Sequence, residues 1–298
     1  MKLKSVSAKD FIGRGIIFLF CLLMIAGCHG DKNVSTSQPG NPGLEKEINI
    51  TGDGITKPGP LTLKKVMELP DAQFEHIYSI INNWPAQKEL VARGVKISAV
   101  LKAAGITSEA KCITIKGKDG YESSFTRQQL LETKRYYFPH VKEGDSSQAE
   151  LVEPIIAYEY LENSNRLSEA RTDSLCLIVP QANVKEQTYH TFVKDIQEIT
   201  VSKEDPGKWE TATVFPAAGK ITRGDTVKLQ HYKLGRVKLY YTLDGSIPTE
   251  KSMLYNPSTY QPELNKPIVI NQDTTIKVLV KGFGKYDSDI AEYHFQVE

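Results

Sequence analysis

The hydrophobic pattern divides the chain into two parts with different periods. Over residues 45–203, short apolar runs mix with apolar positions at helical spacing. The short runs predict strands at 47–51, 74–81, 111–116 and 174–180, with further apolar segments at 154–160 and 192–201. The helical spacing predicts helices at 60–70, 95–104 and 126–133, with Thr62 and Thr126 as N-caps. Because these elements follow no regular βαβ alternation, they predict an α+β domain over residues 45–203.

The pattern changes to short strands separated by turns in the last third of the chain. These strands are predicted at 226–230, 237–243, 268–270, 274–280 and 290–297. Spacing of this kind, without a helical stretch, predicts an all-β sandwich over residues 211–298. The polar segment before it contains Pro206 and Gly207, which marks a domain boundary.

The first 27 residues have the pattern of a processing segment. Four basic residues precede the apolar run 16–25, which is too short for a bilayer span of roughly 20 residues. The run ends in Ala26, Gly27 and Cys28, which resembles the lipobox of bacterial lipoproteins. The resemblance implies a signal peptide over 1–27, lipidation of Cys28, and anchorage on the extracytoplasmic face of a bacterial membrane. An uncleaved anchor helix and an ordinary secretory signal are the alternatives.

The segment 28–44 is rich in glycine, serine and proline and has almost no apolar residue. A segment of this composition cannot bury enough surface to fold on its own. We therefore expect a flexible tether between the lipid anchor and the first domain.

Composition and motifs argue against several classes of function. The chain has 37 basic and 36 acidic residues with no block of like charge, which argues against binding to nucleic acid. It contains no glycine-rich phosphate loop, no nucleophile-elbow serine and no metal-ligand spacing of histidines. Cys112 and Cys176 lie in predicted strands, where buried free thiols are favoured and a disulfide is the alternative.

The order of segments in the first domain resembles the molybdopterin-binding domain of sulfite oxidase-like oxidoreductases. The matching segments are 48–52, 61–63, 93–95, 101–105, 119–121, 156–158, 177–180, 192–194 and 199–201. The resemblance implies a pocket whose wall is the segment 76–84, and a cysteine thiolate on that wall that binds molybdenum. The thiolate position falls near Ser79 or Ile80, and no cysteine occurs between Cys28 and Cys112.

This departure decides what we expect of the cofactor. A serine hydroxyl stays protonated and binds molybdenum far more weakly than a thiolate, so we expect ligation by cysteine to be lost. Molybdopterin stays a possible cofactor, and the candidate pocket residues are Ser79, Asn82, Asn83 and Arg93. Basic side chains available for its phosphate are Arg93, Lys96, Arg127, Lys134 and Arg135. The alternatives are a turn at the asparagines and solvated surface charge at the basic residues.

The segment from residue 215 to the end resembles the chitobiase and β-hexosaminidase carboxy-terminal domain, an immunoglobulin-like or fibronectin-like module. The supporting segments are 216–219, 241–246, 248–249, 252–255 and 275–277. Such modules serve as spacers or accessory domains of surface proteins, so the resemblance implies no glycosidase. A glycosidase would also need paired catalytic carboxylates, and none can be recognised.

Three hypotheses follow for the function. The first, which we favour, is a membrane-anchored lipoprotein whose oxidoreductase-like domain is a non-catalytic ligand-binding or assembly module. The second is a molybdopterin-dependent oxidoreductase with a non-standard metal site. The third is a cell-surface accessory protein that binds a glycan or another protein. The expected partners are the membrane, through the lipid on Cys28, and a cell-envelope protein or glycan, but no nucleic acid.

Overall fold

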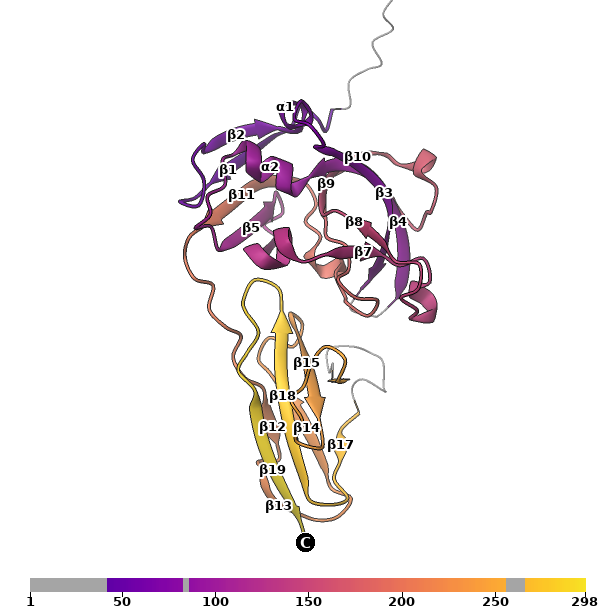
Figure 1. The fold of residues 1–298 in the computed structure, drawn as a ribbon, viewed down its shortest axis with the longest axis vertical. Coiled ribbons are helices and arrows are strands. Elements are labelled where there is room, and N and C mark those ends of the chain that lie inside the picture. The colour runs from indigo at the N-terminus through magenta and orange to yellow at the C-terminus, as the bar shows by residue number, and fades with distance from the viewer. Residues whose placement is uncertain (1–41, 83–85, 256–265) are drawn as a thin grey trace, which may run out of the picture. The chain divides into compact units, whose positions relative to one another are not determined.

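The computed structural model describes residues 42–298 apart from 83–85 and 256–265 (Figure 1). The predicted signal peptide, Cys28 and most of the predicted tether therefore lie outside the described residues. Gly40–Glu298 forms one compact unit, so the predicted boundary between two domains stays a prediction. No helix in the described part of the chain is long and apolar enough to cross a membrane.

Strands dominate the structure, and the predicted α+β class of residues 45–203 is wrong. In the described residues of this part, eleven strands accompany only two α-helices, of five and seven residues. We call the part built from β1–β11 the N-terminal region. Its strands are β1 (Glu47–Thr51), β2 (Gly59–Thr62), β3 (Gln73–Ile81), β4 (Gln87–Lys96), β5 (Cys112–Gly117), β6 (Glu122–Thr126), β7 (Arg135–Tyr137), β8 (Glu150–Val152), β9 (Ile155–Glu162), β10 (Arg171–Ile178) and β11 (Ile196–Ser202). Its helices are α1 (Leu63–Met67), α2 (Ile97–Ala103), the π-helix η1 (Gln128–Glu132) and the 3-10 turns η2 (Val141–Glu143), η3 (Leu167–Glu169) and η4 (Tyr189–Thr191).

Two sheets and a hairpin make up the N-terminal region. The first sheet has the strand order β2-β1-β11-β5-β6, and the second has the order β10-β9-β4-β3. Strands β7 and β8 form a separate antiparallel pair. Only the pairing of β1 with β11 is parallel among the described strands of this region. The last strand of the N-terminal region thus pairs with its first strand in the first sheet.

Strand β4 is the largest element that the sequence pattern did not predict. It pairs with β3 on one side and β9 on the other, and its apolar residues Leu90, Val91 and Ala92 are fully buried. A central strand that is buried on both faces shows no alternation of apolar and polar residues. Arg93 further obscures the pattern, because its charge is compensated only by glutamates on the neighbouring strands.

The predicted helices are shorter than expected, although their caps are correct. The side chain of Thr62 accepts a hydrogen bond from the Lys65 amide, so the residues before it are free to form β2. Thr126 accepts a hydrogen bond from the Gln129 amide at 3.2 Å and precedes η1. Gly105 follows α2 with a φ of +71°, and a Cβ there would lie 2.1 Å from the Thr56 hydroxyl. A glycine is therefore needed where that helix ends.

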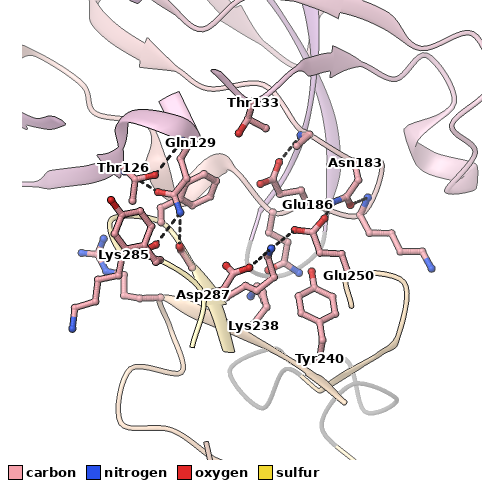
Figure 2. A pocket seen from close by; sticks show the side chains of 18 of the residues that line it. Thr126, Gln129, Thr133, Asn183, Glu186, Lys238, Tyr240, Glu250, Lys285 and Asp287 are labelled. Atoms are coloured by element: carbon pink, nitrogen blue, oxygen red, sulfur yellow. Dashed lines mark hydrogen bonds and ion pairs between the residues drawn. The ribbon is translucent and has the colours of Figure 1, made fainter. Parts of the chain in front are cut away.

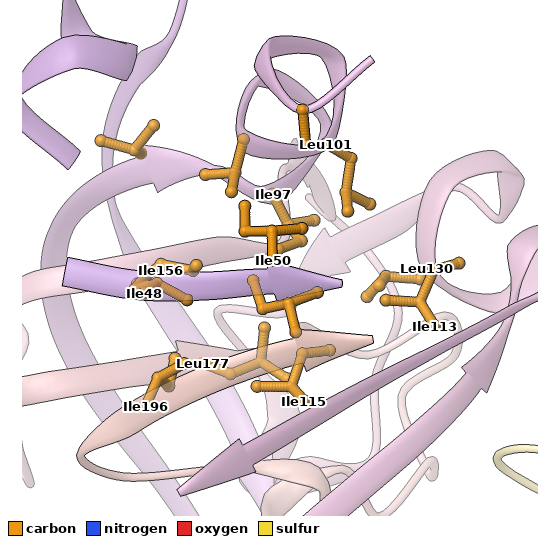
Figure 3. Close-up of a cluster of buried hydrophobic side chains, with 14 of the residues drawn as sticks. Ile48, Ile50, Ile97, Leu101, Ile113, Ile115, Leu130, Ile156, Leu177 and Ile196 are labelled. Atoms are coloured by element: carbon orange, nitrogen blue, oxygen red, sulfur yellow. The ribbon is translucent and has the colours of Figure 1, made fainter. Parts of the chain in front are cut away.

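The core of the N-terminal region lies between the first sheet, α2 and one face of the second sheet (Figure 3). The labelled residues are Ile48, Ile50, Ile97, Leu101, Ile113, Ile115, Leu130, Ile156, Leu177 and Ile196. Strand β10 also contributes Cys176 and Ile178 to a second cluster on the opposite face of its sheet. Both faces of β10 are buried, which explains its nearly continuous apolar sequence.

The described residues of the C-terminal region form strands and no helix, as predicted, and they fit an immunoglobulin-like or FN3-like β-sandwich. Its sheets have the orders β12-β14-β17 and β13-β19-β18-β15-β16. The strands are β12 (Thr213–Phe215), β13 (Gly219–Ile221), β14 (Thr226–Gln230), β15 (Val237–Thr242), β16 (Met253–Tyr255), β17 (Ile268–Val269), β18 (Thr274–Gly282) and β19 (Ala291–Val297). Alternate residues of β15 and β18, such as Leu239 and Val278, are buried in its core. The residues between them, including Lys238 and Lys281, lie on the other face of the sheet.

Candidate functional site

Ser79 and Ile80, the two residues nearest the position of the expected metal thiolate, are both fully buried in β3. Ser79 is the only one of the two with a polar side chain. Its hydroxyl donates a hydrogen bond to Gln181 Oε1 at 2.7 Å and accepts one from the Phe138 amide at 3.0 Å. The hydroxyl is thus engaged both as donor and as acceptor. Ser79 lies among the lining residues of none of the three described cavities.

The other candidates from the sequence do not join Ser79 in one site. Asn82 Oδ1 accepts a hydrogen bond from the Ala86 amide at 2.9 Å, which supports the alternative of a turn after β3. Asn83 lies outside the described residues. Arg93 lies in β4 directly opposite Glu75 of β3. Glu75 precedes Ser79 by four residues in β3, which corresponds to about 13 Å along the strand.

Arg93 is held by neighbouring strands rather than turned toward a ligand. Its Nε donates to Glu75 at 2.7 Å, and its Nη1 donates to Glu159 at 3.0 Å. The hydrogen bonds to Glu75 and then Glu159 raise the pKa of the Arg93 guanidinium. Two carboxylates around one guanidinium would repel a phosphate group at this place.

The residues present do not fit the molybdenum cofactor that the resemblance implies. Ser79 is a buried hydroxyl with both functions used, and Arg93 is already neutralised. Cys112 and Cys176 form no disulfide and lie on different sheets, and burial raises the pKa of the Cys112 thiol, which disfavours a metal-binding thiolate. Within the described residues, no group of three or more histidine, cysteine, aspartate or glutamate side chains is placed to hold a metal ion.

A cavity of about 450 Å³ lies within the compact unit Gly40–Glu298, and both regions contribute to its lining (Figure 2). Its charged residues come from β7, from the loop after β10, and from β15 and β18 with the loops beside them. They are Arg135, Lys185, Glu186, Arg236, Lys238, Glu250, Lys281, Lys285 and Asp287. Six cationic and three anionic side chains therefore face one space.

Arg135 is the buried cation in the part of the cavity lining that the N-terminal region contributes. Its side chain is 1% exposed, and Nη1 lies 3.2 Å from Glu186. The same guanidinium donates to the carbonyl of Pro180 at 2.6 Å and, through Nη2, to the carbonyl of Gln129 at 2.8 Å. Arg135 is thus committed to the protein and fixes Glu186 beside the cavity.

The loop 181–187, which presents Asn183 and Glu186 to the cavity, is held from inside by Gln181. The buried Gln181 amide donates from Nε2 to the carbonyl of Glu186 at 3.0 Å, with longer contacts to the carbonyls of Asn183 and Val184. Its Oε1 accepts the hydrogen bond from Ser79. The residue at the expected thiolate position therefore supports the loop that lines the cavity.

Two lysines on the C-terminal side of the cavity face each other across neighbouring strands. Lys238 in β15 is directly opposite Lys281 in β18. Lys281 Nζ lies 2.9 Å from Glu250 and 2.7 Å from Asp287. Among the described residues, no carboxylate lies within ion-pair distance of Lys238, and burial lowers the pKa of its ammonium to about 8. Lys238 is therefore the uncompensated member of the pair.

Two further titratable groups of the cavity are neutral at physiological pH. Burial, and then the charges of Lys238 and Arg236, lower the pKa of His190 to about 4. Burial, and then the carboxylates led by Glu250, raise the pKa of Tyr240 well above its usual range. Tyr240 therefore keeps its proton and offers an O–H group on the same strand face as Lys238.

The loop after β18 contacts the N-terminal region beside the cavity. The side-chain Nε2 of Gln129 donates to the backbone carbonyls of Gly282 and Lys285 at 2.9 and 3.1 Å. Its Oε1 accepts a hydrogen bond from the backbone amide of Gly284 at 3.0 Å. The Phe283 ring lies 5.5 Å from the Phe125 ring and 5.5 Å from the Arg135 guanidinium. We call the segment 282–285 the docking loop.

The sequence pattern did not point to Lys238, Tyr240 or Lys281 as site residues. Lys238 and Tyr240 lie in the predicted strand 237–243, whereas Lys281 comes directly after the predicted strand 274–280. What the sequence could not supply was the register that places Lys238 opposite Lys281.

Comparisons with known proteins cover the C-terminal region most directly. The family model "Fn3 associated" matches residues 227–295. No curated protein sequence matches the chain. Among solved structures, the sulfane dehydrogenase SoxCD from Paracoccus pantotrophus is similar, with a TM-score of 0.35, 12% sequence identity, and coverage of 82% of this chain and 69% of that chain. At this TM-score the similarity carries no argument about function. The chain carries an Fn3-associated domain in its C-terminal region.

Proposed function

We propose that the protein is a membrane-anchored extracytoplasmic lipoprotein, and that its N-terminal region serves as a non-catalytic ligand-binding or assembly module. The observation that carries this proposal is the environment of Ser79. The place at which an oxidoreductase of the resembling family would present a thiolate holds a fully buried hydroxyl. That hydroxyl is bonded to Gln181 and Phe138 and serves to hold the loop 181–187.

The lining of the cavity also favours binding over catalysis. A covalent mechanism needs a nucleophile next to a base that can accept its proton. The threonine hydroxyls are engaged in the backbone of η1, where Thr126 accepts from the Gln129 amide and Thr133 donates to the Gln128 carbonyl. Among the described residues that line the cavity there is no cysteine or serine. A preformed cavity lined by many charged side chains is suited to hold a charged ligand.

Anchorage rests on the sequence pattern that ends at Cys28. A diacylglycerol on this cysteine, with a further acyl chain, would hold the protein stably at the membrane. Lipidation can be tested with the variant Cys28→Ala. This variant should no longer incorporate a clickable fatty acid and should be lost from the membrane fraction. Unchanged incorporation would contradict lipidation at Cys28.

The absence of molybdenum chemistry is tested on protein purified from its host under native conditions. We expect far less than one molybdenum atom per chain, and no pterin fluorescence after oxidation. An active sulfite oxidase-like enzyme purified in the same way is the positive control. Stoichiometric molybdenum together with pterin fluorescence would overturn the proposal in favour of an oxidoreductase with a non-standard metal site.

A further inference from the structure

Lys238 in β15 and Lys281 in β18 place two like charges at directly opposite positions of one sheet. Residues directly opposite each other on antiparallel strands have Cβ atoms about 4.5–5.5 Å apart, and like charges at such positions are destabilising. Glu250 and Asp287 compensate Lys281 but lie beyond ion-pair distance of Lys238. Burial adds to the cost of the Lys238 charge, as its lowered pKa indicates. The protein therefore maintains a cationic group here at the expense of stability.

The remaining charges of the cavity do not supply the missing partner. Each of its three carboxylates already has a cation, with Glu186 paired to Arg135 and the other two paired to Lys281. Lys285 pairs with Glu210, which is not among the lining residues. Among the described residues, Lys185, Arg236 and Lys238 lack a carboxylate within ion-pair distance. The cavity thus has a surplus of positive charge on its own walls.

The cavity has the size and the polar groups of a small-molecule site. Its volume of about 450 Å³ lies within the range of about 300–1,000 Å³ that is usual for ligand pockets. The Tyr240 hydroxyl, which stays protonated, lies on the same outer face of β15 as Lys238 and lines the same cavity (Figure 2). An ammonium and a phenolic O–H offer two hydrogen-bond donors to one acceptor group.

We infer that this cavity binds the carboxylate or phosphate group of a small anionic ligand, with Lys238 as its principal contact and Tyr240 as a second donor. The inference rests on the proposed ligand-binding role and names the chemical class of the ligand. A cation is disfavoured, because the three carboxylates are already paired. An uncharged apolar ligand would leave Lys238 uncompensated and would lower the dielectric around it.

The charge on Lys238 gives binding a distinct dependence on pH. Below pH 8 the Lys238 ammonium is charged and binds the anion, and above this pH it loses its proton. His190 is neutral throughout this range, and Glu186, Glu250 and Asp287 are held in ion pairs. Binding should therefore weaken as the pH rises from 7 to 9. Around pH 8.5, binding should be accompanied by proton uptake, because a bound anion raises the pKa of Lys238.

The test is isothermal titration calorimetry of the full chain in detergent with inorganic phosphate, citrate and D-glucuronate. Glucose serves as the uncharged control. We expect binding of at least one anion and none of glucose, and the three anions distinguish a phosphate ligand from a carboxylate ligand. Measuring the heat in buffers of different ionisation enthalpy gives the proton uptake.

The decisive variant is Lys238→Met, with Lys228→Met as its matched control on an exposed position of β14. Lys238→Met should weaken anion binding at pH 7 by about tenfold or more, since it removes a charge-assisted hydrogen bond, and should abolish the decline between pH 7 and 9. It should also raise the midpoint of thermal unfolding. Lys238→Arg should retain binding at pH 9, and Lys228→Met should change neither binding nor its pH dependence.

Two results would overturn the inference. One is the absence of binding of all three anions at pH 7, and the other is equal binding by the wild type and Lys238→Met. The molybdenum content of the same preparations keeps this inference separate from the proposed function. Molybdenum-free protein that binds no anion contradicts the anion site alone, whereas stoichiometric molybdenum contradicts the proposed function whatever the anions do.

Discussion

The second sheet of the N-terminal region and the large sheet of the C-terminal region treat polar residues in opposite ways. In the first, Ser79 is enclosed by the fold and both of its hydrogen-bonding functions are used. In the second, Lys238 lies on the outer face of the sheet with no carboxylate partner among the described residues. The family resemblance therefore directed attention to Ser79, whose hydroxyl is fully engaged within the protein. The charge without an ion-pair partner, Lys238, instead indicates where a ligand could bind.

Among the buried polar residues of the N-terminal region, Arg135 is the one whose replacement should reduce stability most. Arg135→Ala removes a guanidinium that bonds Glu186 and the carbonyls of Gln129 and Pro180. Since it removes the cation beside the half-buried Glu186 carboxylate and leaves two carbonyls without their donors, we expect a loss of about 3–5 kcal/mol in the free energy of unfolding, measured in urea. Arg166→Ala is the control, because the Arg166 side chain is 73% exposed, and it should cost about 0–1 kcal/mol. Equal losses in both variants would contradict the structural role of Arg135.

The docking loop decides whether the two regions unfold together. Phe283→Ala removes the ring that packs on Phe125 and Arg135, and we expect a loss of about 2–3 kcal/mol because this ring is only partly buried. The urea transition should also become broader, or split in two, as the regions lose their coupling. Phe215→Ala, at a residue that is 63% exposed, should leave the transition unchanged. A sharp single transition in Phe283→Ala would argue that the docking loop couples nothing.

Ser79→Ala tests whether the buried hydroxyl supports the loop 181–187. The change leaves Gln181 Oε1 and the Phe138 amide without this partner, so we expect a loss of about 1–3 kcal/mol. Backbone amides of the loop should exchange with deuterium faster, as followed by mass spectrometry. The exposed Ser147, replaced by alanine, is the control and should affect neither quantity. Unaltered deuterium exchange of the loop in Ser79→Ala would show that the serine does not support the loop that lines the cavity.

The effect expected at His190 is absent at neutral pH and appears only as a dependence of stability on pH. Its pKa is about 4 in the folded protein, below the value of about 6.5 in the unfolded chain. The unfolded state therefore binds more protons between these values, and stability that is present above pH 6.5 is lost as the pH falls toward 4. We expect the wild type to lose about 3 kcal/mol more than His190→Gln over this range. His294→Gln, at an exposed histidine, should behave as the wild type.

Local pattern was sufficient for elements that lie at one edge or on one face of the fold. Strand β1 was predicted with its observed bounds, β3 within one residue, and Thr62 and Thr126 as caps. Pattern failed at β4, where a central position removed the alternation and charges were compensated by adjacent strands. Missing such strands is what turned a mostly β region into a predicted α+β domain.

The candidate site was less accessible to prediction, because it depends on contacts between distant residues. Gln129 meets the docking loop about 150 residues further along the chain. Lys238 becomes uncompensated only through a register that sets it against Lys281 and leaves Glu250 to the latter. No motif encodes either relation. By contrast, Ser79 was selected from a resemblance, and its actual role as a support for Gln181 required the structure.

The conformation of Gly284 limits how far the Fn3-associated domain can be exchanged for another. Its φ is +89°, and a Cβ on it would lie 3.1 Å from Ser124 in β6. A related module with a larger residue at this turn could fold but would not seat against Gln129. In this chain the module also supplies one wall of the cavity, so a chimera with a foreign module should lose the ligand site even if both halves fold.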